Sequence, residues 1–486
     1  MATRSGTELA EASLVELTEM LLWKDRDAHA EAIVELAERG DERVVPHLVD
    51  LVVIDAIAND WGHFGFPEVL REHSPPRYLA LPEVEWPGVN EALGALAEPS
   101  FDSEYAWVEW ESWYSQQDVE PLEGYEDWKL QLYRSYLPPV GGLLDVEPRT
   151  FDLVDVRWGN CDRSFLAALN APDFLAGDAV DASGPDGDDG GEHERYLEAE
   201  DVVFGFVVEG QAYAVPRWVL FPHEMLNATV EGVPVSLTFC TLCNAPILYD
   251  RRVGEEDAAG DDAVLTFGNT GMLISGNKVM YDEETESLWS QHRGVPIAGE
   301  HVEAETVLSN LAVTQTDWAD WRAEHPETLA LDLDTGFDWD YRYYDGELGI
   351  FRHYWENEDV VQPGVRRDDD RLPEKAPVYG VSGDDPDRVW VFPVETVQER
   401  GVLAGEVAGR PVVALEDPTG DVAVYEAPAL PVEVHDGDLV DAEGARWAVE
   451  PEALVADGER LSRVVGRHGL WFAFRSQYAE ATVVDG

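Results

Sequence analysis

The stretch that decides the fold is PVSLTFCTLCNAPILYDR, residues 234–251, which carries Cys240 and Cys243, two of the three cysteines in the chain. Residues 235–239 alternate like a half-buried strand, and residues 247–249 form its continuation or its partner. Two cysteines on a tight turn can chelate a metal or cycle between dithiol and disulfide. A thioredoxin-type site needs a helix after the cysteines, but Pro246 and the β-branched and aromatic residues that follow favour a strand. We therefore expect a strand, a turn and a second strand.

Two thiolates are only half of a tetrahedral zinc site, so a metal would need further ligands. His223, in the segment FPHEMLN between two expected strands, is the best-placed third ligand, ahead of Cys161, His292 and His63. Soft thiolates with an imidazole suit zinc, copper or iron. Thiol redox chemistry on the same cysteines is the alternative. Side chains near these residues in the sequence are expected to line or support a pocket, namely Glu224, Asn227, Asp282, Trp289 and Gln291.

Other classes of active site lack support in the sequence. The glycine-rich segment FGNTG, residues 267–271, could cradle a phosphate only if a helix followed it, and the residues after it favour strands. The chain shows no dinucleotide-binding glycine pattern, no HExxH helix and no Ser/His/Asp order. We therefore expect neither a nucleotide nor a flavin cofactor.

Residues 1–135 are predicted to form a helical domain of HEAT-like character. Ser13 and Glu16 form a capping-box pattern, and a second helix is expected from Asp27 to Arg39 with Gly40 as its end. The run GDERVVPHL, residues 40–48, is similar to the start of a HEAT repeat unit.

The rest of the chain is expected to be mostly β, which makes the fold class α+β. Residues 136–200 form a connecting segment with an acidic loop, and residues 201–375 form a β-rich module that holds the two cysteines. Residues 376–486 repeat the pattern of that module in shorter form, with Asp417 to Gly420 near the place of the cysteines. We therefore predict an internal duplication whose second copy is degenerate.

The formal net charge is −66, with 99 acidic and 33 basic residues, and only four of the basic residues are lysines. The acidic residues are spread along the chain, a surface typical of a protein that works in very high salt, where charge repulsion is screened. Such a surface argues against binding nucleic acid or an anionic membrane. The polar, helical start of the chain, MATRSGTELAEASLVELTEM, predicts a soluble, cytoplasmic protein, and in that reducing compartment a vicinal cysteine pair favours metal or redox chemistry.

Several long motifs together resemble one prokaryotic family, domain of unknown function 3179. They are the run His223 to Asn227, the segment GVPVSLTFCTLCNAPILYDR, the segment FGNTGMLISGNKVMYDEETESLWSQ, and TDWADWRAEHPET. The resemblance covers about residues 200–385 and indicates a haloarchaeal-type member. It implies a β-rich fold with a Cys-x-x-Cys core motif and no established activity. Cys161 stands where that family has no cysteine.

Three functions follow as expectations. The first is a halophilic protein that binds a transition metal through Cys240, Cys243 and His223. The second is a thiol–disulfide oxidoreductase that uses the same two cysteines without a metal. The third is an interaction protein that binds a protein partner through its helical domain and whose cysteines are structural.

Overall fold

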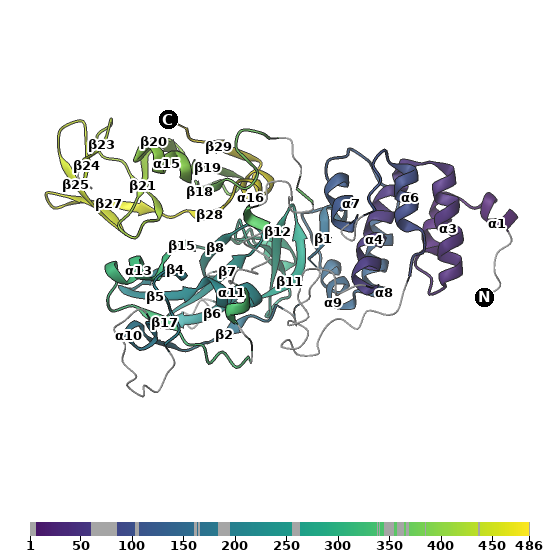
Figure 1. Ribbon diagram of the computed structural model, residues 1–486, viewed down its shortest axis with the longest axis horizontal. Coiled ribbons are helices and arrows are strands. Elements are labelled where there is room, and N and C mark those ends of the chain that lie inside the picture. The colour runs from purple at the N-terminus through teal and green to yellow at the C-terminus, as the bar shows by residue number, and fades with distance from the viewer. Residues whose placement is uncertain are drawn as a thin grey trace.

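The chain folds into a helical part followed by two β regions. This computed structural model describes residues 6–59, 85–102, 106–159, 163, 166–182, 195–254, 263–337, 339, 341–344, 354–356, 364–365, 369–383, 385–435 and 438–485. Figure 1 shows the helical part at one end of the molecule and the two β regions, one above the other, at the opposite end. The predicted order, helices first and then mostly strands, is confirmed.

The helical part begins as its capping residues predict. The Ser13 hydroxyl accepts a hydrogen bond from the Glu16 N–H, and the Glu16 carboxylate accepts one from the Ser13 N–H, which closes the capping box. The second predicted helix spans Arg26–Arg39 and ends at Gly40, whose φ of 66° is the left-handed value that glycine tolerates. The elements are α1 Gly6–Glu11, α2 Leu14–Met20, α3 Arg26–Arg39, η1 Glu42–Val44, α4 Val45–Asn59, α6 Val89–Leu96, α7 Ala106–Tyr114, α8 Tyr125–Tyr136, α9 Pro138–Gly141, η2 Leu143–Asp145 and η3 Leu153–Asp155.

The first β region contains the two cysteines. Its elements are β1 Val156–Trp158, β2 Leu169–Asn170, β3 Phe174–Ala176, α10 Gly177–Val180, β4 Val202–Val208, β5 Gln211–Pro216, α11 Arg217–His223, β6 Met225–Val230, β7 Val233–Cys240, β8 Ala245–Asp250, β9 Arg252–Val253, β10 Ala263–Val264, β11 Phe267–Ile274, β12 Asn277–Asp282, β13 Leu288–Ser290, β14 Val295–Ala298, α12 Glu300–Glu303, β15 Asn310–Leu311, β16 Thr314–Asp317, α13 Trp318–Glu324, β17 Leu329–Leu331 and η4 Tyr341–Tyr344.

Three five-stranded sheets form most of this region. Their strand orders are β1-β11-β12-β13-β14, β15-β8-β7-β6-β2 and β16-β4-β5-β17-β3. The first of these sheets continues the core of the helical part, because buried residues of the helices form one apolar cluster with Val156, Met272, Val279 and Ala298. The helical part is therefore fixed against the β11–β12 hairpin by a shared core.

The second β region follows residue 376. Its elements are β18 Pro377–Ser382, β19 Arg388–Pro393, α15 Val394–Arg400, β20 Val402–Val407, β21 Arg410–Glu416, β22 Val422–Glu426, β23 Glu433–His435, β24 Asp438–Val440, β25 Arg446–Glu450, β26 Ala453–Ala456, β27 Glu459–Val464, β28 Arg467–Leu470, α16 Trp471–Gln477 and β29 Glu480–Val483. They form a four-stranded sheet, β28-β18-β19-β29, and an eight-stranded one, β20-β21-β22-β27-β26-β25-β24-β23.

One strand arrangement occurs in both β regions. In the first, β16 and β5 both pair antiparallel with β4, and β17 pairs parallel with β5. In the second, β28 and β19 both pair antiparallel with β18, and β29 pairs parallel with β19. A short helix, α13 or α16, joins the outer antiparallel strand to the parallel strand in each case.

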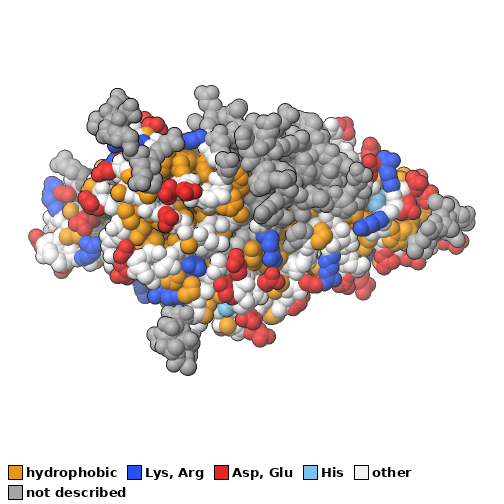
Figure 2. Space-filling model, turned by 90° about the horizontal axis from the view of Figure 1, so that it is seen from below, with side chains coloured by type: hydrophobic (Ala, Val, Ile, Leu, Met, Phe, Trp, Pro, Cys, Tyr) orange, Lys and Arg blue, Asp and Glu red, His pale blue; other side chains and the backbone are white. Residues whose placement is uncertain are grey.

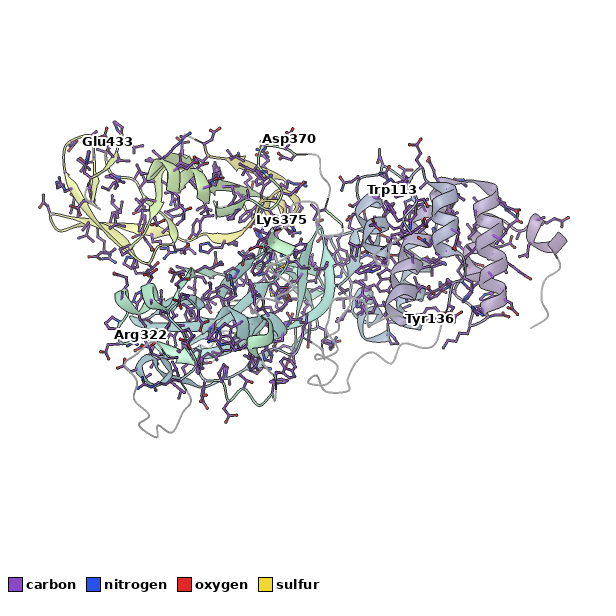
Figure 3. The ribbon with its side chains drawn as sticks, viewed as in Figure 1. Trp113, Tyr136, Arg322, Asp370, Lys375 and Glu433 are labelled. Carbon is purple, nitrogen blue, oxygen red and sulfur yellow. The ribbon has the colours of Figure 1, made fainter. Side chains whose placement is uncertain are left out.

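On the face drawn in Figure 2, the acidic side chains do not gather in one patch. Figure 2 shows them scattered over one face of the molecule from end to end, as the even spread of acid along the sequence predicted. The lysines behave differently, because Lys129, Lys278 and Lys375 are buried, and only Lys24 is exposed. Lys375, labelled in Figure 3, lies where the two β regions meet. Across the described part of the chain, no helix is long and apolar enough to cross a membrane.

Candidate functional site

Cys240 and Cys243 lie on the turn between two antiparallel strands, as predicted. Cys240 is the last residue of β7 and pairs with Ala245, the first residue of β8. Thr241 to Asn244 make the turn, and Asn244 has the left-handed φ of 45° that this residue type tolerates. The sequence therefore sets the two cysteines on a rigid hairpin end, with no helix after them.

The two sulfur atoms are 2.6 Å apart, and both cysteines are free and buried, with 1% and 0% of their surface exposed. A disulfide bond is about 2.05 Å long, so a small displacement would join them. Tetrahedral zinc would hold two thiolates about 3.8 Å apart, because each Zn–S bond is about 2.3 Å. The spacing is thus shorter than zinc-bound thiolates would keep and lies closer to the length of a disulfide bond.

The environments of the two sulfurs differ. Burial raises the pKa of Cys240, but hydrogen bonds from the Cys243 thiol and from the backbone N–H groups of Lys278 and Cys243 outweigh it, and the pKa falls below its usual value. Burial raises the pKa of Cys243 well above its usual value, and the neighbouring Cys240 raises it further. Because the Cys240 sulfur already accepts backbone N–H groups, the shared proton belongs on Cys243. Cys240 is therefore the more acidic of the two thiols.

Residues from every part of the chain enclose this thiol pair. Cys240 and Cys243 belong to one apolar cluster with Val365, Leu470, Phe472 and Ala473. The Leu470 N–H, at the end of β28, donates to the Cys243 carbonyl at 2.9 Å. The Val365 carbonyl accepts hydrogen bonds from two residues that follow α7, namely from Ser115 at 3.3 Å and from Gln116 at 2.7 Å. Hydrogen bonds from the second β region and from the helical part thus position the residues that cover the two cysteines.

The β11–β12 hairpin covers the Cys243 sulfur. Its two-residue turn, Ser275 and Gly276, has positive φ at both positions, 49° and 74°, as a type I′ turn requires. The Gly276 carbonyl oxygen lies 3.3 Å from the Cys243 sulfur, and the Asn277 side-chain amide donates to the same sulfur at 3.5 Å. This turn was not predicted as part of the site.

Glu224 and Lys278 form a buried polar group behind the thiol pair. Glu224, a predicted pocket residue, accepts hydrogen bonds from the Thr241 N–H at 3.3 Å and the Thr241 hydroxyl at 2.6 Å. The Lys278 ammonium lies 3.6 Å from the Glu224 carboxylate and donates to the Glu224 carbonyl, the Phe239 carbonyl and the Asn269 side chain. Lys278 was missed, although the scarcity of lysine in this chain could have signalled it.

Gln291 was predicted in the pocket and does support the turn. Its side-chain amide donates to the Thr238 hydroxyl at 2.9 Å and to the Ala245 carbonyl at 3.1 Å, which ties β7 to β8 directly behind the cysteines. Its carbonyl oxygen accepts from Asn277 at 2.9 Å. Asn277 therefore connects Gln291 to the Cys243 sulfur.

His223 is the last residue of α11 and is wholly buried. Its Nδ1 lies 2.7 Å from the Ala167 carbonyl and its Nε2 lies 2.7 Å from the Tyr341 hydroxyl. The ring stacks on Trp339. Burial lowers the pKa of His223 to about 4, although the Ala167 carbonyl acts in the opposite direction, so the ring is neutral. Both ring nitrogens thus face hydrogen-bond partners other than the cysteines, and a ligand role for His223 stays a prediction.

The other predicted pocket residues have partners of their own. Asn227 donates to the Asn170 side chain and the Phe267 carbonyl, both at 2.8 Å. Asp282 accepts from the Trp289 indole at 2.9 Å and closes the turn before β13. Cys161 and His63 lie outside the described residues. Within the residues that are described, no three His, Cys, Asp or Glu side chains are grouped so that they could hold a metal ion.

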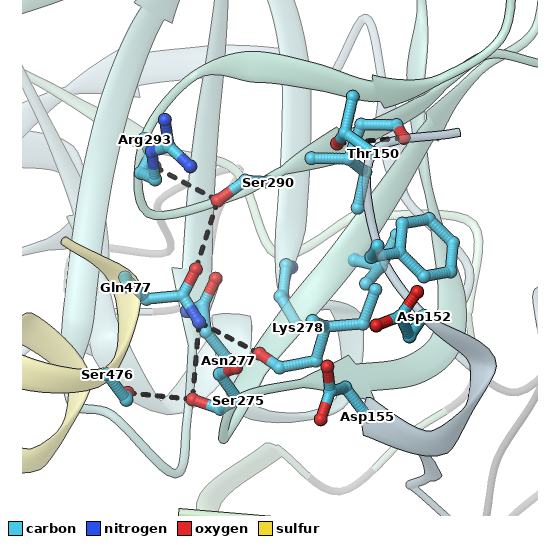
Figure 4. Close-up of a pocket in the computed structure, with 14 residues that line it drawn as sticks. Thr150, Asp152, Asp155, Ser275, Asn277, Lys278, Ser290, Arg293, Ser476 and Gln477 are labelled. Atoms are coloured by element: carbon cyan, nitrogen blue, oxygen red, sulfur yellow. Dashed lines mark hydrogen bonds between the residues drawn. The ribbon is translucent and has the colours of Figure 1, made fainter. Parts of the chain in front are cut away.

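A pocket of about 260 Å³ opens on the other side of the β11–β12 turn (Figure 4). Residues 150–155, at the end of the helical part, form one wall, and β11 to β14 form a second. Ser476 and Gln477 of α16 form a third wall, where Ser476 donates to the Ser275 carbonyl at 2.8 Å and Gln477 donates to the Ile274 carbonyl at 2.8 Å. Asn277 lines the pocket and also touches the Cys243 sulfur.

These features define a β-rich protein with a buried vicinal dithiol at the junction of two β regions. The chain belongs to the family described as protein of unknown function (DUF3179), whose model matches residues 183–482. The match confirms the resemblance seen in the motifs and extends through the second β region. No curated protein and no solved structure matches the chain.

Proposed function

We propose that this protein is a thiol–disulfide redox protein whose reacting groups are Cys240 and Cys243. The observation that carries the proposal is the 2.6 Å approach of two free thiols with opposite pKa shifts. A lowered pKa makes Cys240 a good leaving group when a disulfide between the two is reduced. Cys243, which lies against the turn beside the pocket, is then the sulfur that exchanges with the substrate.

The reaction balances with a low-molecular-weight disulfide, R–S–S–R, as oxidant. The Cys243 sulfur attacks one substrate sulfur while its proton passes to Cys240, and the first RS⁻ leaves and takes that proton. The Cys240 thiolate then attacks the Cys243 sulfur, and the second RS⁻ leaves. The protein loses two electrons and the substrate gains them. The turn at Ser275 and Gly276 has to move to admit the substrate sulfur, because Cys243 is fully covered.

Thiol titration after exposure to a disulfide tests the proposal. Untagged protein is incubated with trans-4,5-dihydroxy-1,2-dithiane, quenched in acid and analysed by peptide mass spectrometry. We expect a disulfide between Cys240 and Cys243 that dithiothreitol reverses. Cys161→Ser is the matched control, since it removes the remaining cysteine, and it should leave this reaction unchanged.

Single variants test which of the two sulfurs attacks the substrate and which resolves the mixed disulfide. With L-cystine as oxidant, Cys240→Ser should form a mixed disulfide on Cys243 more slowly than the wild type reacts, because serine does not take the Cys243 proton. That adduct should persist, because the resolving thiolate is gone. Cys243→Ser should form far less adduct on Cys240. The proposal fails if the wild-type pair stays reduced at every concentration of the disulfide.

Metal binding by the same sulfurs is the second candidate. It is supported by two thiols that face each other in an apolar chamber, a donor set that copper(I), zinc and iron accept, and for each metal the two sulfurs would have to move apart. Elemental analysis of protein purified without a histidine tag tests it. A stoichiometric metal that disappears in Cys240→Ser, and also in His223→Gln, would support the predicted ligand set and argue against the dithiol reaction.

We also propose that the two β regions are duplicated copies. The shared strand arrangement supports this, and so does a repeated contact between a glycine and an aromatic ring. A Cβ atom on Gly205 in β4 would overlap the ring of Trp321 in α13, and one on Gly380 in β18 would overlap the ring of Phe474 in α16. An experimental structure in which the two four-strand sets do not superpose would remove the proposal.

The remaining expectations concern the helical part and the host. Helices that pack side by side, with α6 against α3 and α4, support a HEAT-like arrangement, and pull-down with residues 1–135 deleted tests whether the helical part binds a protein partner. The scattered acidic surface supports a haloarchaeal-type, cytoplasmic protein, and free thiols fit a reducing compartment. We expect the far-UV circular dichroism signal to collapse on dialysis into dilute buffer; an unchanged signal would contradict salt dependence.

A further inference from the structure

The pocket beside the thiol pair carries charges of opposite sign on opposite walls. Arg293 and Ser290 lie at one side of the pocket in Figure 4, and Asp152 and Asp155 lie at the other. Between them the lining is polar and uncharged, with hydroxyl and amide groups from Ser275, Thr150, Asn277, Ser476 and Gln477.

Arg293 is the cation available to a ligand. Its side chain lines the pocket, and among its terminal nitrogens only Nη2 has a partner among the described residues, Asp387. Lys278 also lines the pocket, but its ammonium is directed to Glu224 and Asn269. A guanidinium carries five N–H donors in a planar fork, so the donors that Asp387 does not use can bond a ligand carboxylate.

The size and position of the pocket restrict the ligand further. The pocket volume of about 260 Å³ lies just below the roughly 300–1,000 Å³ that ligand pockets span, so a nucleotide or a protein segment is too large. The Asn277 side chain separates the pocket from the Cys243 sulfur. A ligand in the pocket therefore lies one side chain away from the thiol pair.

We infer that this pocket binds a small thiol of amino-acid type, or its disulfide, in the zwitterionic form. Its carboxylate bonds Arg293, its ammonium lies between Asp152 and Asp155, and its sulfur points toward Asn277 and Cys243. This inference rests on the proposed redox function and adds the class of the substrate. It also explains why all three parts of the chain border the pocket, because the binding site exists only when they are assembled.

Binding of an unreactive ligand tests the pocket apart from the redox reaction. The probe is S-methyl-L-cysteine, titrated calorimetrically into the full-length Cys240→Ser, Cys243→Ser double variant in the salt that keeps it folded. Two matched probes are 2-(methylthio)ethylamine, which lacks the carboxylate, and 3-(methylthio)propanoate, which lacks the ammonium. We expect the zwitterion to bind, and each matched probe to bind at least about tenfold more weakly, the size of one charged hydrogen bond.

Variants assign the two ends of the ligand. Arg293→Gln should weaken binding of S-methyl-L-cysteine about tenfold, and so should the Asp152→Asn, Asp155→Asn double variant. Asp387→Asn is the control, because it removes the other partner of Arg293 and should leave binding equal or tighter. Equal binding of all three probes, or no binding of the zwitterion, would overturn the inference.

Oxidation kinetics of the wild-type protein distinguish the two proposals. L-cystine should oxidise the thiol pair with saturation, while cystamine and 3,3′-dithiodipropionate should react slowly and without saturation. Equal, unsaturable rates for all three would overturn the pocket inference and leave the redox function standing. Binding of S-methyl-L-cysteine without oxidation by any of the three would keep the pocket and remove the redox function.

Discussion

Replacing Lys278 by methionine should loosen the strands that carry the thiol pair. The Lys278 ammonium donates to the Glu224 carbonyl at 2.6 Å, to the Asn269 side chain at 2.7 Å and to the Phe239 carbonyl at 3.2 Å. The Glu224 carboxylate lies 3.6 Å away. These contacts connect β12 with β7, with β11 and with Glu224 at the end of α11. One side chain therefore connects four elements around the thiols. Methionine keeps the length of the side chain and removes the charge and the donors.

Removing one partner of a buried ion pair costs about 3–5 kcal/mol, because the other charge stays buried without its partner. Glu224 keeps two hydrogen bonds from Thr241, which places the expected cost near the lower end, at about 3 kcal/mol. At about 1.4 kcal/mol for each factor of ten, that is roughly a hundredfold rise in local opening.

Amide hydrogen exchange measures this opening directly, and it suits a chain of several parts, whose unfolding does not follow two states. In Lys278→Met, protection of the amides in β7, β11 and β12 should fall about a hundredfold, and alkylation of Cys240 and Cys243 should accelerate in parallel. The exposed Lys24→Met is the control and should change stability by less than about 0.5 kcal/mol. Protection within threefold of the wild type in Lys278→Met would refute the reasoning.

Three further outcomes follow from single side chains. Burial raises the pKa of Asp417 to about 6, so the folded protein holds a proton on this carboxyl group that the unfolded chain releases. The stability that this group contributes is therefore lost as pH rises from about 4 to 6. Asp417→Asn should stabilise the protein at pH 8 by up to about 3 kcal/mol, measured by thermal melts. Burial lowers the pKa of His292 to about 3, so the stability that this group contributes is complete above pH 6.5 and is lost as pH falls toward 3. His292→Phe should therefore shift the midpoint of acid unfolding to lower pH, and an unshifted midpoint would contradict this. Gln116→Ala removes the 2.7 Å hydrogen bond to the Val365 carbonyl and should speed thiol alkylation several-fold without changing the fold by circular dichroism.

Local patterns predicted the elements that carry the site. Alternation in residues 235–239 and the β-branched residues after Pro246 identified β7 and β8, and the capping residues located the early helices. These predictions are correct because strand alternation and helix capping depend on neighbours only a few residues away in the sequence. The strand–turn–strand form of the cysteine motif, and hence the lack of a helix after it, was also read correctly from Pro246.

Contacts between distant segments could not be read from the sequence. Leu470 and Val365 cover the thiols, and nothing in their local sequence indicates it. The partners of the His223 ring nitrogens, Ala167 and Tyr341, were not predicted either, and Tyr341 comes from an aromatic stretch without a clear period. Lys278 had a usable signal, because an acidic chain that has nearly eliminated lysine keeps three of its four lysines in buried positions.

The two β regions dock onto each other reciprocally, and this explains where the thiols lie. The turn after β7 packs on β28 of the second region, where the Leu470 N–H donates to the Cys243 carbonyl. The turn after β21 packs on β16 of the first region, where the Gln315 N–H donates to Asp421 at 3.0 Å. β16 and β28 occupy equivalent positions in their sheets, so each region covers the turn of the other with the equivalent strand. Only one of the two turns carries sulfur; the other carries buried carboxylates beside Arg463. The second region is therefore needed to close the dithiol site, although it has no thiol of its own. Because the site needs both regions, a family match that spans both of them is expected.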